Sequence, residues 1–454
     1  MKNCYVRGPM RIFPRSVLFL LLFIFWCDYD AWGRVYLDID SPTFKPFLIA
    51  VPDFQAFSGN REQKDNSPAS MSGSLSDYLM MTGFFNVISR NAYLEDQKPA
   101  PEGANEAIRF ADWMAIGAEY LVKGKFQYRG KELTLECRLY DAVRSELVVG
   151  KKYAGNASER KKMIRKFAGE VLSALTGVGG IFSTRVTFVE KKGKTWGIFS
   201  IGFDGDVSDL LRHKEGNTVL MSPRWSPDGR YISYTSFEEG NPDFYIKDMV
   251  NSKVTPIASF QGINLSGGWS PKSDKVLLTL SRDGNEEIYV LDFANKLLQR
   301  LTNNFAIDVS PAWSPDGSKI AFVSNRSGTP QIYIMDADGN NVRRLTYDGN
   351  YNTSPSWSPQ SQDDRIVFES RTAGNFQIFT IGLDGNNLKQ MTFEKGSSES
   401  PSWSPDGRYI AFIQNNGVKN KIYVMNATGS NVRLLYEGSG DCSFTSWSPL
   451  IKLE

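Results

Sequence analysis

The stretch Ser310-Pro-Ala-Trp-Ser-Pro-Asp-Gly317 decides the fold, because it returns along the chain at a nearly constant interval. Complete or degenerate copies of it surround six of the ten tryptophans: Trp225, Trp269, Trp313, Trp357, Trp403 and Trp447. Successive tryptophans in this set are 44, 44, 44, 46 and 44 residues apart. Self-similarity at such a period indicates a repeat architecture, in which each copy is one supersecondary unit.

Three segments after Trp313 are short and rich in β-branched and aromatic residues, as strands are. They are Lys319–Ser324, Gln331–Asp336 and Asn341–Thr346. Turn chemistry separates the segments, since Ser-Pro-Asp-Gly fits a type I turn and Asp338-Gly339 suits a tight hairpin. Together with the tryptophan segment, each repeat supplies four strands, which is one blade of a β-propeller. We expect the tryptophan segment to be the inner strand and its ring to pack between neighbouring blades.

The array is predicted to close on itself. Three strand-like segments, Arg185–Val189, Gly197–Ile201 and Val207–Leu211, have no tryptophan motif before them. The last motif, at Trp447, has almost nothing after it. We therefore expect the C-terminal segment to supply the inner strand of the first blade, giving six blades and no free sheet edge. An open solenoid is the competing fold, but it requires polar caps that this array lacks.

Residues 1–33 are predicted to be a secretory signal peptide. A basic region carrying four Lys or Arg residues precedes the unbroken apolar run Val17–Cys27, and Ala31-Trp-Gly33 offers small residues for cleavage before Arg34. The apolar run is short for a membrane-spanning helix, which disfavours an uncleaved anchor. Lipoprotein processing at Cys27 is disfavoured by the bulky Phe25 and Trp26 before it.

Residues 34–176 are predicted to form a small α/β domain. The clearest helix covers residues 158–175, because its apolar side chains fall on one stripe. The remaining expected helices are Leu75–Phe85 and Arg109–Gly117, and the expected strands are Val35–Ile39, Phe47–Val51, Asn86–Ser89, Tyr120–Tyr128, Leu133–Tyr140 and Leu147–Tyr153. The polar stretch Ser58–Ser74 is expected to be a surface loop. Residues 177–184 are then a linker, and residues 185–454 the propeller.

Charge and residue content argue against several classes of function. The net charge is +2, and removing residues 1–33 takes away four basic and two acidic side chains, which leaves a neutral chain without an electrostatic footprint for nucleic acid. The single histidine, His213, and the lack of a Gly-Xaa-Ser-Xaa-Gly elbow disfavour a Ser-His-Asp triad and a histidine-based zinc site. Cys137 and Cys442 lie in different halves of the chain and predict no disulfide framework.

One short segment superficially resembles a calcium-binding loop. Asp336-Ala-Asp-Gly-Asn340 has the acidic spacing of such a loop, but Asn341 and Tyr347 occupy its glycine and glutamate positions. A hairpin turn is the better interpretation. Asp308 and Glu399 could hold a cation at the channel mouth, although nothing in the sequence requires one. We expect no catalytic residue, no cofactor and no metal.

The tryptophan motif, with Ile-Ala-Phe and Ile-Tyr-Xaa-Met downstream, resembles the propellers of the TolB family. The same order of a signal peptide, a small α/β domain and a six-bladed propeller is found in that family. Directly after the predicted cleavage site, Arg34-Val-Tyr-Leu-Asp-Ile-Asp-Ser41 is similar to the family's Val-Arg-Ile-Val-Ile-Asp-Ser segment. The sequence departs from the pattern at Pro271-Lys272 and Pro359-Gln360, where the Pro-Asp-Gly turn is missing.

The resemblance implies a non-enzymatic component of the Tol–Pal system, located in the periplasm. It would link the inner-membrane Tol proteins to the peptidoglycan-associated lipoprotein, Pal, and support outer-membrane integrity, envelope constriction during division and protein import. Its implied partners are TolA and Pal. We expect a monomer with no membrane span after cleavage of the signal peptide.

The resemblance also implies two binding regions. TolA would bind the segment after the signal peptide, namely Arg34, Val35, Tyr36, Leu37, Asp38, Ile39, Asp40 and Ser41. An extended, alternating segment of this kind can add to a partner's sheet edge, or it can be an ordinary strand of its own domain. Pal would bind the channel mouth at which the inner strands begin. The residues expected there are Asn264, Ser266, Asp308, Val309, Asn352, Thr353, Ser398 and Glu399.

Two other classes of function stay open at this point. Similar blades cap prolyl-oligopeptidase-type enzymes, so a propeller-gated hydrolase is one alternative, although no triad is evident. A small-ligand-binding propeller is the other, and it would place aromatic residues in the mouth loops. Those loops read as mainly Asn, Asp, Ser and Thr, with Phe444 as an exception.

Overall fold

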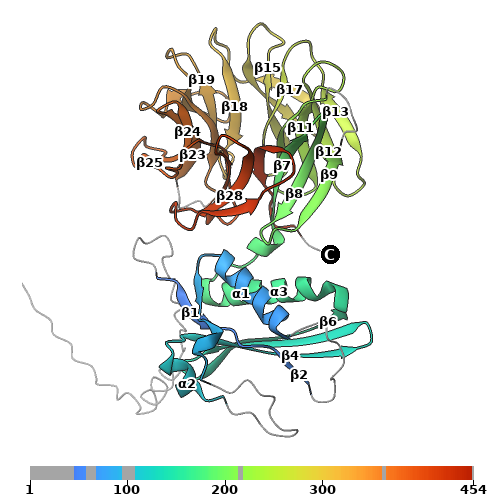
Figure 1. The fold of residues 1–454 in the computed structure, drawn as a ribbon. Helices are drawn as coiled ribbons and strands as arrows, with labels where there is room; N and C mark the ends of the chain where they lie inside the picture. The colour runs from blue at the N-terminus through green and yellow to red at the C-terminus, as the bar shows by residue number, and fades with distance from the viewer. Residues whose placement is uncertain (1–44, 58–67, 95–107, 213–217, 360–363, 452–454) are drawn as a thin grey trace, which may run out of the picture. The chain divides into compact units, whose positions relative to one another are not determined.

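The computed structural model describes residues 45–57, 68–94, 108–212, 218–359 and 364–451. It confirms the predicted fold class, a six-bladed β-propeller that follows an N-terminal α/β domain (Figure 1). The predicted signal peptide, the segment Arg34–Ser41, the expected strand Val35–Ile39 and His213 lie outside the described residues.

The α/β domain contains one mixed sheet with the strand order β3-β1-β4-β5-β6, and β2 pairs with β4. Its strands are β1 (Phe47–Ala50), β2 (Gln55–Ala56), β3 (Phe85–Val87), β4 (Tyr120–Arg129), β5 (Glu132–Asp141) and β6 (Glu146–Asn156). β1 runs parallel to both β3 and β4, whereas β4, β5 and β6 form an antiparallel meander. The meander is the one that the sequence predicts, because its strands alternate between apolar and polar residues.

Two helices cover one face of this sheet (Figure 1). The helices of the domain are α1 (Pro68–Met81), α2 (Phe110–Ala115) and α3 (Arg160–Thr176), with short 3-10 turns η1 (Arg90–Ala92), η2 (Ala157–Glu159) and η3 (Ile181–Ser183). Side chains of α1 and α3 share a core with those of β5, where Leu75, Phe167 and Leu135 are all fully buried.

The start of α1 corrects the sequence prediction. A loop was expected up to Ser74 and a helix from Leu75, but the helix already begins at Pro68 and ends at Met81. Proline suits the first position of a helix, because its missing N–H would have no partner there. Met71, Leu75 and Leu79 recur every four residues and are completely buried, so the serines between them do not make a loop.

The propeller consists of six four-stranded antiparallel sheets. The first blade contains β7 (Arg185–Lys192), β8 (Thr195–Gly202), β9 (Val207–Arg212) and β30 (Asp441–Trp447). The second blade contains β10 (Leu220–Trp225), β11 (Tyr231–Ser236), β12 (Asp243–Asp248) and β13 (Val254–Ala258). The third blade contains β14 (Asn264–Trp269), β15 (Lys275–Leu280), β16 (Glu287–Asp292) and β17 (Leu297–Arg300). The fourth contains β18 (Asp308–Trp313), β19 (Lys319–Ser324), β20 (Gln331–Asp336) and β21 (Arg343–Arg344); the fifth β22 (Asn352–Trp357), β23 (Arg365–Thr372), β24 (Asn375–Gly382) and β25 (Lys389–Gln390); and the sixth β26 (Ser397–Trp403), β27 (Tyr409–Asn415), β28 (Asn420–Asn426) and β29 (Arg433–Tyr436).

The predicted closure of the ring is confirmed. β30, the last strand of the chain, pairs antiparallel with β7, and Trp447 lies opposite Val186. The tryptophan-bearing strands β10, β14, β18, β22, β26 and β30 contact one another in succession and are therefore the inner strands. Every sheet of the closed ring therefore has a neighbouring blade on both sides.

The tryptophans pack between blades, as the repeat predicts. Trp357 joins a cluster of buried side chains from the fourth and fifth blades, and Trp403 one from the fifth and sixth. Their indole N–H groups also reach back to the preceding blade, where Trp357 Nε1 donates to Ala312 O at 2.9 Å and Trp403 Nε1 to Ser356 O at 3.2 Å. The rings of Trp357 and Trp403 thus add a directional contact to the apolar packing.

Every inner strand contains a β-bulge at the Ser-Pro step or its equivalent. The residue three positions before the tryptophan is left-handed in five of the six strands, with φ between 50° and 56°: Ser222, Ser310, Ser354, Ser400 and Phe444. In four of these strands the next residue is proline, which has no N–H to lose from the ladder. The bulge turns the second half of each inner strand relative to the first.

Two smaller expectations concern the hairpin and the cysteines. Asp336–Asn340 is the turn between β20 and β21, with Gly339 N donating to Asp336 O at 2.9 Å, so the hairpin interpretation is confirmed. Cys137 and Cys442 are both buried free thiols.

Closure of the ring can be tested by truncation. Removing residues 441–454 deletes β30 and leaves β7 paired only with β8, with its other edge free, and it removes Trp447, which is 7% exposed. We expect the free energy of propeller unfolding to fall by at least about 3–5 kcal/mol, the usual loss for one buried large aromatic side chain. Denaturant melts of the truncated protein and of a control lacking only residues 452–454 would measure this. An unchanged transition in the longer truncation would refute closure by β30.

Candidate functional site

The two ends of the propeller channel are built from different connections. One end, the loop mouth, is where each outer strand connects to the next inner strand; the other, the tryptophan mouth, is where each inner strand ends at its tryptophan. The residues five positions before each tryptophan stand at the loop mouth: Leu220, Asn264, Asp308, Asn352, Ser398 and Cys442. All six are at most 1% exposed. Four of the sequence-predicted residues are therefore equivalent to one another and deeply buried.

Two of these buried residues hold the loop that leads to them. Asn264 Nδ2 donates to Phe260 O at 2.7 Å, and Asn264 Oδ1 accepts from Phe260 N at 3.1 Å. Asn352 Nδ2 donates to Asp348 O and to Gln331 Oε1, both at 2.8 Å. An asparagine amide can donate and accept at once, so it satisfies the backbone of a tight loop.

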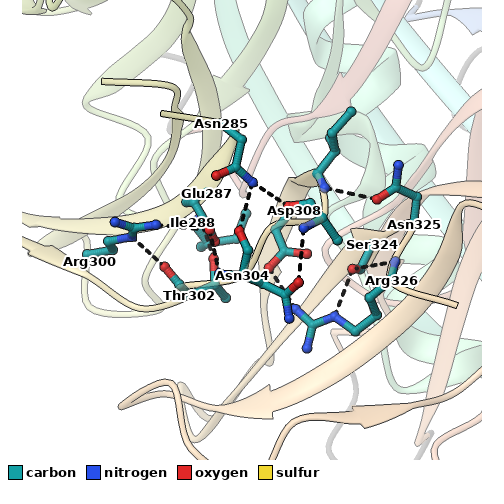
Figure 2. Close-up of polar contacts among 12 residues, drawn as sticks. Asn285, Glu287, Ile288, Arg300, Thr302, Asn304, Asp308, Ser324, Asn325 and Arg326 are labelled. Atoms are coloured by element: carbon teal, nitrogen blue, oxygen red, sulfur yellow. Dashed lines mark hydrogen bonds and ion pairs between the residues drawn. The ribbon is translucent and has the colours of Figure 1, made fainter. Parts of the chain in front are cut away.

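At the joint between the third and fourth blades, a charged residue, Asp308, occupies the position of these asparagines (Figure 2). Asp308 accepts from Arg326 at 2.7 Å, and the neighbouring Glu287 accepts from Arg300 at 3.0 Å. Both carboxylates are completely buried. Burial raises the pKa of Asp308, opposed by hydrogen bonds from Ser324 and by the charge of Arg326. Each buried carboxylate thus has its own arginine, which is the condition under which burial of a charge is tolerated.

The same network holds the loop between β17 and β18 from both sides (Figure 2). Asn285 Nδ2 donates to Asn304 O at 2.9 Å and to Ala306 O at 2.5 Å. On the other side, Ile307 N donates to Asn325 Oδ1 at 2.9 Å. A loop anchored at three points has little conformational freedom to lose on binding a partner.

This anchored loop presents an exposed aromatic side chain. Phe305 is 95% exposed at its tip, and equivalent loops of the next two joints expose Tyr347 at 71% and Phe393 at 76%. Ile307 and Tyr351 beside them are 43% and 39% exposed. The sequence predicts that these loops are mainly polar, so these exposed aromatic side chains differ from the prediction. A signal was present, because a threonine stands two residues after the ends of β17, β21 and β25, and an aromatic residue follows it within three positions; these threonines are Thr302, Thr346 and Thr392.

The other sequence-predicted residues lie deeper in the mouth. Val309, Thr353 and Glu399 follow the buried position directly and are partly exposed. Val309 also packs against the core between the fourth and fifth blades. Ser266 is 9% exposed, and its hydroxyl lies 3.1 Å from that of Ser233. The eight residues therefore lie at one end of the channel, but five of them are buried and the other three are half-buried.

A buried acid lies between two of the bulges. Glu369, on β23, is 8% exposed and accepts from Ser354 Oγ at 3.0 Å and from Ser400 N at 2.6 Å. Burial raises the pKa of Glu369 to about 7, and the charge of the nearby Glu399 adds to the rise. The carboxyl group therefore titrates close to neutral pH.

Among the described residues, no group of three or more His, Cys, Asp or Glu side chains could hold a metal ion. Within the same ranges, no helix has both the length and the apolarity needed to cross a membrane. At the loop mouth, exposed aromatic side chains stand on loops, and buried polar groups hold the loop that carries Phe305.

Comparison with known proteins relates both parts of the chain to one family. A family model described as "TolB beta propeller domain" matches residues 172–451, and one described as "TolB amino-terminal domain" matches residues 35–148. The chain is 46% identical over 235 residues to the Tol-Pal system protein TolB of Syntrophus aciditrophicus and 38% identical over 258 residues to that of Desulfosudis oleivorans. These matches cover 51% and 56% of each chain, so they span about half the length of the curated relatives.

A solved structure extends the similarity to most of the chain. The crystal structure of TolB from Acinetobacter baumannii superposes with a TM-score of 0.75 at 26% sequence identity. The superposition covers 89% of this chain and 96% of the other. It includes the α/β domain as well as the propeller, since the propeller alone makes up a smaller share of the chain.

The buried acid at the bulges makes stability depend on pH. Because the folded state holds the proton of Glu369 up to about pH 7, whereas a free glutamate releases it near 4.5, stability should fall as pH rises through this window. Relative to Glu369→Gln, the wild-type protein should lose about 3 kcal/mol between pH 4 and pH 8. Urea melts of both proteins across this range measure the difference. A constant difference would mean that Glu369 does not keep its proton in the folded protein.

Proposed function

The chain belongs to the TolB family, and we propose on that premise that it is a non-enzymatic, protein-binding component of the Tol–Pal system that acts in the periplasm. In this proposal Pal binds the loop mouth of the propeller, and TolA binds the segment Arg34–Ser41 after a cleaved signal peptide. The protein then links the inner-membrane Tol proteins to Pal and supports outer-membrane integrity and constriction during division.

The exposed aromatic side chains at the loop mouth are the observation that carries the proposal. Phe305, Tyr347 and Phe393 present large apolar surfaces to solvent at three successive blade joints. Aromatic residues are enriched at the centres of protein interfaces, and exposed apolar patches often mark binding sites. The serine and threonine side chains inside the mouth suit the polar contacts of such an interface.

The rigidity of the loop that carries Phe305 also favours a protein as the binding partner. The buried polar groups beneath Phe305 hold its loop in one conformation before a partner arrives. A preorganised surface loses less entropy on binding, so that more of the contact energy appears as affinity. In the proposal, a protruding loop of the partner enters the loop mouth between these aromatics.

The aromatic residues provide the test of Pal binding. Phe305→Ala and Phe393→Ala should each weaken binding to purified Pal about tenfold or more, as expected for interface hot spots. Their stability should stay nearly unchanged, because both side chains are largely exposed. Calorimetric titration measures the affinity, and denaturant melts check the fold.

A matched control lies at the other end of the same blade. Leu297 is 65% exposed at the start of β17, near the tryptophan mouth, and Leu297→Ala should bind Pal with wild-type affinity. Charged substitutions at Ser266 or Val309 are poorer tests, since both side chains pack against the blades and could unfold them. Equal losses from Phe305→Ala and Leu297→Ala, or no loss from either, would place Pal elsewhere.

Binding of TolA is tested separately, through the N-terminal segment. The mature protein is first purified from the cell envelope, and N-terminal sequencing should find Arg34 as its first residue. Deleting residues 34–41 should then abolish binding to TolA while leaving Pal binding intact, because the two partners use different parts of the chain. Full TolA affinity after the deletion would rule out this segment as the binding site.

A further inference from the structure

The tryptophan mouth, at the end of the channel opposite the proposed Pal site, contains a cavity of about 450 Å³. Its wall is a double ring of side chains, formed by six tryptophans and the six prolines two positions after them: Trp225, Trp269, Trp313, Trp357, Trp403 and Trp447, with Pro227, Pro271, Pro315, Pro359, Pro405 and Pro449. Pro227 and Pro315 are exposed on the rim, so the ring borders solvent. Such a wall favours apolar and proline-containing ligands.

One charged side chain projects among these rings. Among the described residues that line the cavity, Arg224 is the only one with a charged side chain. The equivalent residues of the other five blades, one position before each tryptophan, are small: Gly268, Ala312, Ser356, Ser402 and Ser446. The five small residues leave space for the cavity, and the sixth, Arg224, gives it a positive charge.

The positive charge of Arg224 is not compensated within the described part of the chain. Arg224 Nη1 donates to Thr445 O at 3.0 Å, and none of the ion pairs between described residues involves Arg224. Burial lowers the pKa of the Arg224 guanidinium, with no charged neighbour contributing. By contrast, Arg300 and Arg326 at the loop mouth, which are also partly buried, each face a carboxylate. A partly buried cation without an anion loses hydration that nothing replaces, and a ligand anion would offset that loss.

We propose that the tryptophan mouth is a second binding site, which takes the free C-terminal carboxylate of an extended peptide whose last residues are proline or aliphatic. The guanidinium of Arg224 would bind the carboxylate through paired N–H donors, a geometry that arginine provides and lysine does not. The indole and proline rings would contact the last side chains. A chain end is favoured over an internal acidic residue, because a chain end brings one segment into a cavity of about 450 Å³, whereas an internal residue brings two.

The site is independent of the proposed Pal site. The two lie at opposite ends of the inner strands, since Arg224 is at the last residue but one of β10, whereas Phe305 precedes the first residue of β18. Binding at the tryptophan mouth would therefore give the propeller a second partner without displacing the first.

The test compares one peptide in two chemical forms. Acetyl-alanyl-prolyl-leucine with a free carboxylate should bind the mature protein, and its C-terminal amide should bind about tenfold more weakly or worse, because the amide lacks the charge that Arg224 would pair with. Isothermal titration calorimetry measures both affinities, and quenching or enhancement of tryptophan fluorescence reports contact with the ring. Equal affinity for the acid and the amide, or no binding of the acid at millimolar concentration, would overturn the proposal.

Two variants tie the effect to the guanidinium. Arg224→Met keeps the length of the side chain but not its charge, so its affinity for the acid should drop to that for the amide. Arg230→Met is the matched control: Arg230 belongs to the turn that follows Trp225, its side chain is 54% exposed, and it pairs with Asp248 outside the cavity. Wild-type affinity is expected for this control. If Arg224→Met bound the acid as tightly as the wild-type protein does, the assignment of Arg224 would be wrong.

A third variant guards against misfolding. If Arg224→Met does not give a wild-type unfolding transition, Arg224→Lys keeps the charge in the cavity but cannot form the paired contact. We then expect weaker binding of the acid than in the wild-type protein and a remaining preference for acid over amide. Loss of that preference in a folded lysine variant would contradict a charge-based site, and wild-type affinity would contradict the paired contact.

Discussion

The pairing of β30 with β7 is the contact on which the rest of the propeller depends. It joins the two ends of the repeat array, with Ser448 N donating to Arg185 O at 2.8 Å and Arg185 N donating to Ser448 Oγ at 2.9 Å. A blade of a propeller contacts only its two neighbours, as repeats do generally. Once the ring is closed, each tryptophan has a blade on either side, and the channel acquires two separate mouths.

The two mouths differ because the connections that form them differ. Loops of variable sequence join one blade to the next at the loop mouth, and buried polar side chains hold these loops in place. The tryptophan mouth is formed by the repeated turn itself, so its wall is nearly uniform, with Arg224 as the exception. Variation is therefore concentrated where loops can change without disturbing the packing of the blades.

The joints between blades solve one packing problem in different ways. The buried position five residues before the tryptophan is apolar in two blades, as Leu220 and Cys442, and polar or charged in the others. Asn264 and Asn352 satisfy their own loops, whereas Asp308 needs Arg326 from the turn after the neighbouring strand β19. Differences of this kind disfavour pairing of an inner strand with the wrong blade, since a buried polar group is stable only beside its own partner.

The sequence by itself determined the propeller, the number of blades, the closing strand and the place of the tryptophans, because these follow from a period and from local turn chemistry. It also located the helix α3 and the meander of the α/β domain through their apolar spacing. The first turns of α1 were missed, since serines among buried residues look like a loop until the sheet beneath them is known.

Only the tertiary structure decided which residues at the mouths are accessible. Asn264, Asp308, Asn352 and Ser398 are polar and stand at the predicted end of the channel, yet they are buried between blades. Phe305 is apolar and almost fully exposed. Polarity in a sequence does not show which side of a closed ring a side chain faces, because burial depends on neighbours that are forty or more residues away and meet only when the blades pack.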